Sequence, residues 1–239
     1  MKYIFGPVKS RRLGLSLGVN IIPHKTCCFD CIYCQLGPTT NKTTERKGYL
    51  DTGELSCELK SFLQNVDPKT TKINFITFSG TGEPTLNSKI GELISETKKI
   101  VSIPIAVITN SSLLFKDDVR RSLLQADVIL PTLSFPDNET FFAINKPAPA
   151  LNSADIAKGL IALRNEFKGK IWLEIMLVRG INDNPKKLEK LKEIVDLIKP
   201  DKIHLNMPIR LPKGSKITSP VRKTLDKIKN LFGDKCEII

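Results

Sequence analysis

The stretch that decides the fold is Ile171-Trp172-Leu173-Glu174-Ile175-Met176-Leu177. Its odd-numbered residues are all aliphatic, and in a strand they lie on one face, which suits packing against helices. The even-numbered residues Trp172, Glu174 and Met176 face the other side, which must therefore tolerate a carboxylate. A sheet covered by helices on both faces would not tolerate it, whereas a barrel interior that holds a ligand would. The stretch thus favours a barrel over a doubly wound sheet.

Further apolar segments along the chain extend this pattern. They lie at residues 18–22, 73–78, 105–109, 128–134 and 203–207. Helical patterns alternate with them, at 54–66, at 88–101, and from Pro185 to just before Lys199. Six strands in alternation with helices predict parallel strands joined by right-handed crossovers. We therefore expect an α/β fold, a partial (βα)6 TIM-like barrel with parallel strands.

The chain has 239 residues, a length typical of one barrel domain. We expect a single domain over 1–239, with an N-terminal extension at 1–17, a cysteine loop at 23–36 and strand–helix repeats to about residue 232. Residues 145–152 are proline-containing and predict a long exposed loop. No apolar run is long enough to cross a bilayer, and the first residues do not resemble a signal peptide. We therefore expect cytoplasmic localisation and no membrane partner.

The formal net charge of the chain is +12, which favours anionic partners such as RNA. The lysines are scattered through the helical segments, however, and this scatter is more typical of solvated helix faces than of a nucleic-acid groove. The pair Arg11-Arg12 is different, because it lies just ahead of the cysteine loop.

Four of the six cysteines lie between residues 27 and 34. In a reducing compartment this crowding favours a metal site over disulfides. Cys27, Cys31 and Cys34 have the spacing CxxxCxxC, close enough for one loop to wrap an iron–sulfur cluster with thiolate ligands. A 4Fe-4S cube held by only three cysteines leaves one iron free to bind a small molecule.

Other assignments of the cysteines are open at this point. Cys28, Cys31 and Cys34 also read as CxxCxxC. A zinc site is an alternative, and so is a cluster closed by Cys28, Cys57 or Cys236. Zinc sites with four thiolates normally use two separated cysteine pairs, and neither Cys57 nor Cys236 has a paired neighbour.

The cysteine loop resembles that of the radical S-adenosylmethionine (SAM) superfamily, whose CxxxCxxC carries an aromatic residue just before the last cysteine, as Tyr33 does here. Register with that family favours Cys27 over Cys28. The resemblance extends to residues 6–14, 79–86, 108–110 and 179–183. These segments look like an uncharacterised Fe-S oxidoreductase subgroup that is often grouped with wyosine-base synthases, which modify tRNA.

The resemblance implies an enzyme in which Cys27, Cys31 and Cys34 hold a 4Fe-4S cluster and the open iron binds the amino and carboxylate groups of SAM. An electron donor such as flavodoxin or ferredoxin would supply one electron. The carbon–sulfur bond of SAM would then break, giving methionine and a 5'-deoxyadenosyl radical that abstracts hydrogen from a substrate. The basic charge suggests RNA as that substrate, and a peptide is the alternative.

The resemblance also implies cofactor contacts at the ends of the strands. Glycines in the turn after residue 78 permit close backbone approach, and Glu83 offers a charge opposite to the SAM ammonium. Ser134 is implied as a ribose contact, while capping of the strand end is an equal alternative for Asn110. The full set of expected SAM contacts is Tyr33, Gly80, Gly82, Glu83, Thr109, Asn110, Ser134, Glu174 and Asn206.

Burial of Glu174 without a partner would be costly, so a polar partner in the barrel interior or a bound ligand is expected. Arg11, Arg12 and Arg210 are the expected substrate contacts. His204 is expected to be a satisfied histidine, and no side chain is predicted to act as a catalytic acid or base. Two other functions stay open from the sequence: an activase of a glycyl radical enzyme, and a non-catalytic, metal-stabilised nucleic-acid-binding protein.

Overall fold

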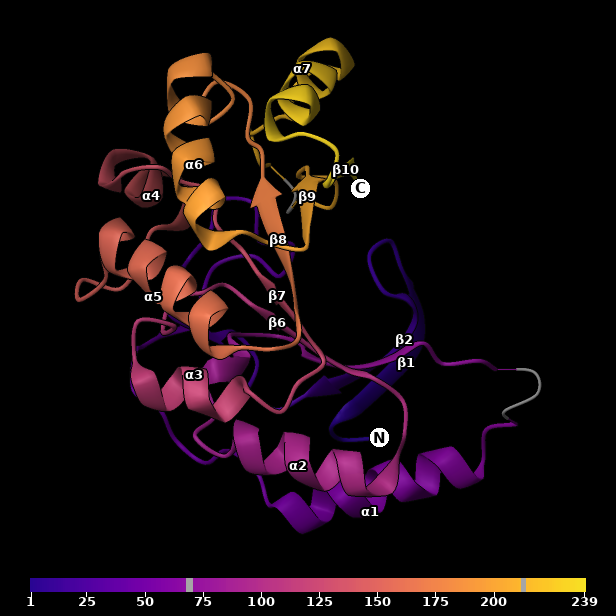
Figure 1. The fold of residues 1–239 in the computed structure, drawn as a ribbon. Coiled ribbons are helices and arrows are strands. Elements are labelled where there is room, and N and C mark those ends of the chain that lie inside the picture. The colour runs from indigo at the N-terminus through magenta and orange to yellow at the C-terminus, as the bar shows by residue number, and fades with distance from the viewer. Residues whose placement is uncertain (68–70, 212–213) are drawn as a thin grey trace.

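The computed structural model describes residues 1–67, 71–211 and 214–239 and contains one curved, eight-stranded sheet (Figure 1). Across the sheet the strands are β1 (Ile4–Ser10), β2 (Gly14–Asn20), β5 (Phe75–Ser79), β6 (Ile105–Thr109), β7 (Val128–Pro131), β8 (Lys170–Met176), β9 (Lys202–Asn206) and β10 (Cys236–Ile238). β1 runs antiparallel to β2, and all other neighbouring strands are parallel. β1 and β10 are the two edges of the sheet, so the barrel is open.

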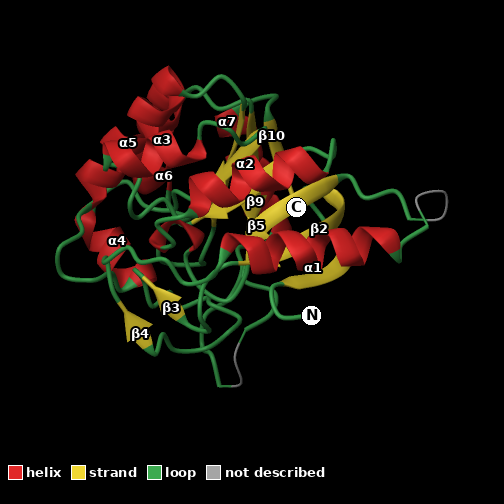
Figure 2. Ribbon diagram, turned by 90° about the horizontal axis from the view of Figure 1, so that it is seen from below, coloured by secondary structure: helices red, strands yellow, loops and turns green. Residues whose placement is uncertain are grey.

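Helices connect successive strands and form an outer layer. They are α1 (Thr52–Gln64), the 3-10 turn η1 (Pro84–Leu86), α2 (Ile90–Ile100), α3 (Asp117–Leu123), α4 (Asn138–Asn145), α5 (Ser153–Glu166), α6 (Pro185–Ile198) and α7 (Arg222–Phe232). Figure 2 shows β3 (Thr26–Cys27) and β4 (Asn41–Lys42) as a separate small ribbon near α4. None of the helices in the described ranges combines the length and apolar character needed to cross a bilayer.

The predicted α/β partial barrel is confirmed, with six parallel strands where the sequence predicts them. β2 begins at Gly14, however, so part of the expected N-terminal extension is strand, and β1 adds an antiparallel edge. β10 adds a further parallel strand after α7. The helix that was expected to begin at Pro185 does so, with Asn184 as its N-cap and Lys199 as its left-handed C-cap.

Alternation along β8 separates two environments, as predicted. Ile171, Leu173 and Ile175 are buried in the main core between the sheet and the helices. Trp172 faces the interior of the barrel, which we call the lumen, and there it joins a second apolar cluster. The helices cover only the outer face of the sheet. The inner face, which lines the lumen, can therefore carry polar side chains.

The amino end of the lumen is filled by the turn between β1 and β2. Leu13 from this turn is 3% exposed and packs with Ala106, Val128 and Leu130 from two neighbouring strands. Above this layer, the hydroxyl groups of Ser16 and Thr77 hydrogen-bond at 2.6 Å. The turn between β1 and β2 therefore closes the amino end of the barrel.

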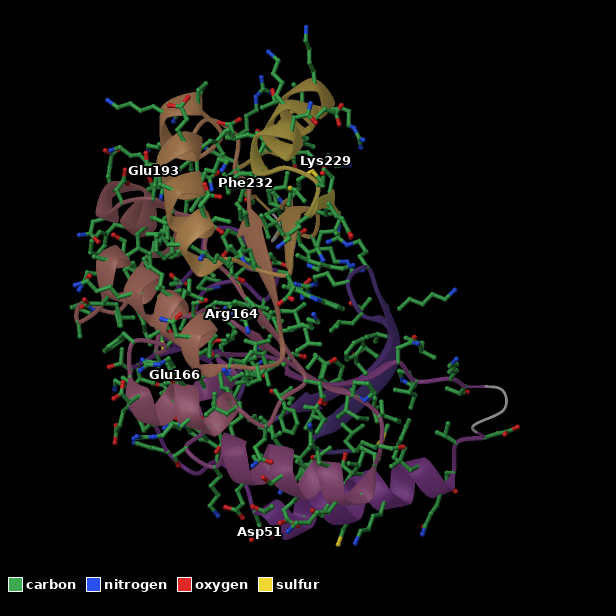
Figure 3. All side chains as sticks on the ribbon, in the orientation of Figure 1. Asp51, Arg164, Glu166, Glu193, Lys229 and Phe232 are labelled. Atoms are coloured by element: carbon green, nitrogen blue, oxygen red, sulfur yellow. The ribbon has the colours of Figure 1, made fainter. Side chains whose placement is uncertain are left out.

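Ion pairs fix the outer layer at the amino edge of the sheet. Arg164 and Glu166, at the end of α5 and labelled in Figure 3, pair with Asp201 and with Arg120 of α3. Asp201 also accepts a hydrogen bond from the backbone N–H of Ile171 at 2.9 Å. These contacts tie α5 to the start of β8 and to the loop before β9.

The expectation of an exposed loop at 145–152 is right only in part, because Lys146, Pro149 and Ala150 are exposed and the rest of the segment is not. Asn145, Pro147, Ala148 and Leu151 are buried. The segment folds inward because its backbone hydrogen-bonds to the cysteine loop, with the Ala148 N–H donating to the Cys28 carbonyl at 2.9 Å. The prolines predicted an interruption of regular secondary structure in this segment. They did not indicate that the segment packs against the cysteine loop.

Leu13→Ala should lower the free energy of unfolding by about 2–4 kcal/mol, because it removes a buried side chain and leaves a cavity under the lumen. Denaturant titration measures the change. Leu197→Ala, at a side chain that is 61% exposed, is the control and should change stability by less than about 0.5 kcal/mol. Equal effects of the two substitutions would show that the turn does not fill the barrel.

His204 gives stability a pH dependence. It lies buried in the lumen with its ring centroid 5.8 Å from that of Trp172, and burial lowers its pKa to about 4. The expectation of a satisfied histidine is wrong, because its buried Nδ1 has no hydrogen-bond partner in the described structure. Between pH 6.5 and 4 the unfolded chain binds a proton that the folded chain does not, so stability should fall with pH by up to about 1.4 kcal/mol per unit. His204→Leu should remove this part of the slope in denaturant titrations, and an unchanged slope would contradict the assignment.

Candidate functional site

The cysteine loop, residues 23–36, lies at the carboxyl ends of the parallel strands. The turn after β5 holds it there through two backbone hydrogen bonds. The Lys25 N–H donates to the Thr81 carbonyl at 2.7 Å, and the Glu83 N–H donates to the Thr26 carbonyl at 3.1 Å. This is the end of a parallel barrel at which active sites are normally built.

Cys27, Cys31 and Cys34 are free and half-buried. Cys28 is fully buried in the main core. Burial raises the pKa of Cys27 to about 12 and that of Cys31 to about 11. A metal would have to supply the positive charge that makes these buried sulfurs thiolates.

Each of the three half-buried sulfurs accepts a hydrogen bond from a different side chain. The pairs are Asn110 Nδ2 with Cys27 Sγ at 3.3 Å, Asn145 Nδ2 with Cys31 Sγ at 3.3 Å, and Lys25 Nζ with Cys34 Sγ at 3.4 Å. The donors come from the end of β6, the end of α4 and the cysteine loop itself. A set of donors aimed at sulfur is the environment that cluster thiolates use in proteins.

Glycine is required in the turn after β5 for steric reasons. A Cβ on Gly82 would lie 2.0 Å from the Thr26 carbonyl oxygen. Gly80 has φ of +140°, and a Cβ there would lie 2.1 Å from Asn20 Oδ1. The two glycines therefore let the turn approach the cysteine loop and the end of β2.

Glu83 is 1% exposed and its carboxylate accepts hydrogen bonds from the chain itself. Oε1 accepts from the Thr85 N–H and hydroxyl at 3.1 and 2.7 Å and from the Thr109 hydroxyl at 2.6 Å, while Oε2 accepts from the Asn110 N–H at 2.7 Å. Burial raises the pKa of Glu83, and these donors oppose the rise. Glu83 thus joins the turn after β5 to the end of β6, where Asn110 reaches Cys27.

The polar partner expected for Glu174 is Arg12, which forms an ion pair with it inside the lumen. Arg11 Nη2 donates to Asn206 Oδ1 at 3.1 Å. Both arginines come from the turn between β1 and β2, so two of the expected substrate contacts meet two of the expected SAM contacts. Arg210 is exposed in the segment after β9.

Two further expected SAM contacts, Ser134 and Tyr33, already contact other parts of the chain. Ser134 is fully buried, and its hydroxyl accepts a hydrogen bond from the Met176 N–H at 2.9 Å, so a ribose contact would require its neighbours to move. Tyr33 packs with Ile144 and Met176, and burial raises its pKa. Its hydroxyl lies 3.5 Å from Asn145 Nδ2.

Comparison with known proteins identifies the family. The model of the radical SAM superfamily matches residues 21–197. This chain belongs to that superfamily. The matched region includes the cysteine loop, the turn after β5 and β8, whereas Arg11, Arg12 and Asn206 lie outside it.

Two relatives share most of the chain. The GTPase Obg of Brachyspira hyodysenteriae is 41% identical over 237 residues, which are 99% of this chain and 34% of that protein. A UPF0026 protein of Methanocaldococcus jannaschii is 36% identical over 98% of this chain and 72% of its own length. The chain thus spans about a third of the GTPase and most of the UPF0026 protein.

Solved radical SAM structures share the fold. A radical SAM methyltransferase from Sphaerobacter thermophilus superimposes with a TM-score of 0.66 over 94% of this chain and 65% of its own, at 18% identity. Likeness at this identity supports the fold and says nothing about the substrate.

Sequence reasoning missed Lys25 and Asn145. Asn145 lies 114 residues from the cysteine that it contacts, and no local pattern links the two. Lys25 precedes the motif by two positions, and its burial to 3% exposure is unusual for a lysine and visible only in the structure.

Gly82→Ala should destabilise the protein by about 1–3 kcal/mol and lower the amount of iron bound after anaerobic reconstitution, because the new methyl group displaces the cysteine loop. Gly48→Ala is the control, since a Cβ there would first meet a flexible lysine carbon at 3.3 Å. Thermal unfolding and iron analysis measure the two effects. Normal iron binding by Gly82→Ala would show that the close approach is not needed.

Proposed function

We propose that this single radical SAM domain, residues 1–239, holds a 4Fe-4S cluster on Cys27, Cys31 and Cys34 and cleaves SAM reductively. The three half-buried sulfurs at the carboxyl ends of the strands, each with its own N–H donor, carry the proposal. When bound, the cluster would pass one electron to SAM, whose carbon–sulfur bond breaks to give methionine and a 5'-deoxyadenosyl radical that takes hydrogen from a substrate.

The positions of the other cysteines support a cluster with an open iron. Cys28 points into the core, Cys57 lies exposed on α1, and Cys236 pairs in register with Ile203 near the amino end of β9. Cys57 and Cys236 thus belong to other parts of the fold, which leaves three sulfurs for the site.

A zinc ion and an iron–sulfur cube place different demands on the spacing of their sulfur ligands. In a tetrahedral zinc site with Zn–S bonds of about 2.3 Å, the sulfurs lie about 3.8 Å apart. Within residues 1–67, 71–211 and 214–239, no three Cys, His, Asp or Glu side chains converge to hold one metal ion. A cube attaches its thiolates to different iron atoms and therefore takes sulfurs that are further apart.

The residues around the lumen are proposed to bind SAM and position it. Gly82 brings backbone groups close to the cysteine loop, Gly80 brings the same turn close to the end of β2, and Glu83 fixes the end of β6 beside Cys27. Glu174 and Asn206 face the lumen from β8 and β9, where Arg12 and Arg11 now hydrogen-bond to them. We propose Tyr33, Thr109, Asn110 and Ser134 as further groups lining this space.

The partners that we propose follow from the charge and the chemistry. The cluster needs a one-electron donor such as flavodoxin or ferredoxin. RNA is the substrate class that the net charge of +12 favours, with Arg11, Arg12 and Arg210 as contacts, and a peptide is the alternative. Salt dependence of binding to a generic single-stranded RNA separates the two classes, since phosphate contacts weaken steeply with salt.

The test uses alanine variants of four neighbouring cysteines. Anaerobically reconstituted protein should bind about four iron atoms per chain and form 5'-deoxyadenosine from SAM with dithionite, as measured by chromatography. Cys27→Ala, Cys31→Ala and Cys34→Ala should each lose the product, because each removes a ligand. Cys28→Ala should keep both iron and product. Zinc in the purified protein, or activity that depends on Cys28 in place of Cys27, would refute the assignment.

A further inference from the structure

Lys25 differs from the other two donors to sulfur because it carries a full positive charge. It is 3% exposed, and its ammonium donates both to Cys34 Sγ at 3.4 Å and to the Gly37 carbonyl. No carboxylate in the described parts of the chain forms an ion pair with it. A buried ammonium without a counter-charge is costly, so its position calls for a negative partner.

The backbone holds Lys25 in that position. Its N–H donates to the Thr81 carbonyl at 2.7 Å, and its carbonyl accepts from the Asn41 N–H at 3.1 Å. Its φ of +58° is uncommon for a residue with a side chain and persists only where the surroundings fix it. The backbone thus fixes Lys25 at a point from which its ammonium reaches Cys34 Sγ.

We propose that the Lys25 ammonium, assisted by the amides of Asn110 and Asn145, raises the reduction potential of the group held by Cys27, Cys31 and Cys34. This inference rests on the proposed function. Lys25 acts as a positioning residue through the charge that it places beside Cys34.

The physical argument concerns the change in charge on reduction. Three thiolates are negative, and one added electron makes the cluster with its ligands more negative still. A nearby positive charge and N–H donors to sulfur stabilise the reduced form more than the oxidised form. The amides of Asn110 and Asn145 act in the same direction with partial charges, so the loss of either should have a smaller effect than the loss of Lys25.

The choice of substitutions separates charge from shape. Lys25→Gln keeps a long polar side chain with N–H donors and removes the charge, whereas Lys25→Arg keeps the charge. Lys168→Gln removes an exposed charge at the other end of the sheet and is the matched control. All four full-length proteins are reconstituted anaerobically, assayed for iron and sulfide, and titrated potentiometrically with detection of the reduced cluster by electron paramagnetic resonance.

At the wild-type midpoint potential, Lys25→Gln should show a ratio of reduced to oxidised cluster about tenfold lower than wild type. Lys25→Arg and Lys168→Gln should stay within about twofold of wild type. A fully loaded Lys25→Gln protein with the wild-type midpoint would overturn the inference and leave the proposed function intact. A wild-type protein that holds no reducible iron–sulfur cluster would overturn both.

A second variant decides the matter if Lys25→Gln fails to assemble a cluster. Asn145→Leu keeps the side-chain shape, removes the N–H that reaches Cys31, and also removes a buried amide oxygen that has no hydrogen-bond partner in the described structure. It should lower the same ratio about threefold, because the ratio responds only to the part of the hydrogen-bond strength that differs between the oxidised and reduced states. An unchanged ratio in this fully loaded variant would count against the inference.

Discussion

The close contact between the turn after β5 and the cysteine loop is the constraint on which the site depends. Gly82 lets the Thr26 carbonyl approach the turn, and two backbone hydrogen bonds then hold the loop on the strand ends. From the same turn, Glu83 bonds to the end of β6 and so positions Asn110 against Cys27. The main core and the helices supply the rigidity that keeps the strand ends aligned. A short glycine-containing turn therefore allows the barrel to hold the cysteine sulfurs at the carboxyl ends of its strands.

Charge is distributed in two layers around the lumen. At the cysteine loop, side-chain N–H groups face the sulfurs, and the lysine among them is the group with a full charge. Below, Glu174 pairs with Arg12, so the carboxylate that would otherwise be buried alone is neutralised. The lower layer follows the rule that buried charges persist when they are paired. The apolar layer around Leu13 closes the space beneath them.

Local sequence patterns predicted the features that depend on neighbouring residues. The six parallel strands, the two faces of β8 and the spacing of the three cysteines are of this kind, because alternation and spacing are local. β10 was missed because Cys236–Ile238 has three residues and too little pattern. The inward path of residues 145–152 and the roles of Asn145 and Lys25 depend on contacts with distant or buried groups, which a single sequence does not encode locally. The contacts proposed for SAM rest on resemblance, and the structure adds that several of these side chains already bond to one another.

Both ends of the chain lie near the carboxyl ends of the parallel strands, which is also where the cysteine loop lies. Tyr3 accepts a hydrogen bond from the Asn20 N–H at the end of β2, and the Ile239 N–H donates to Leu205 near the end of β9. Any domain fused before Met1 or after Ile239 would consequently be tethered beside the mouth of the barrel. A neighbour attached there would be held at high local concentration near whatever enters the lumen, without needing a docking surface of its own.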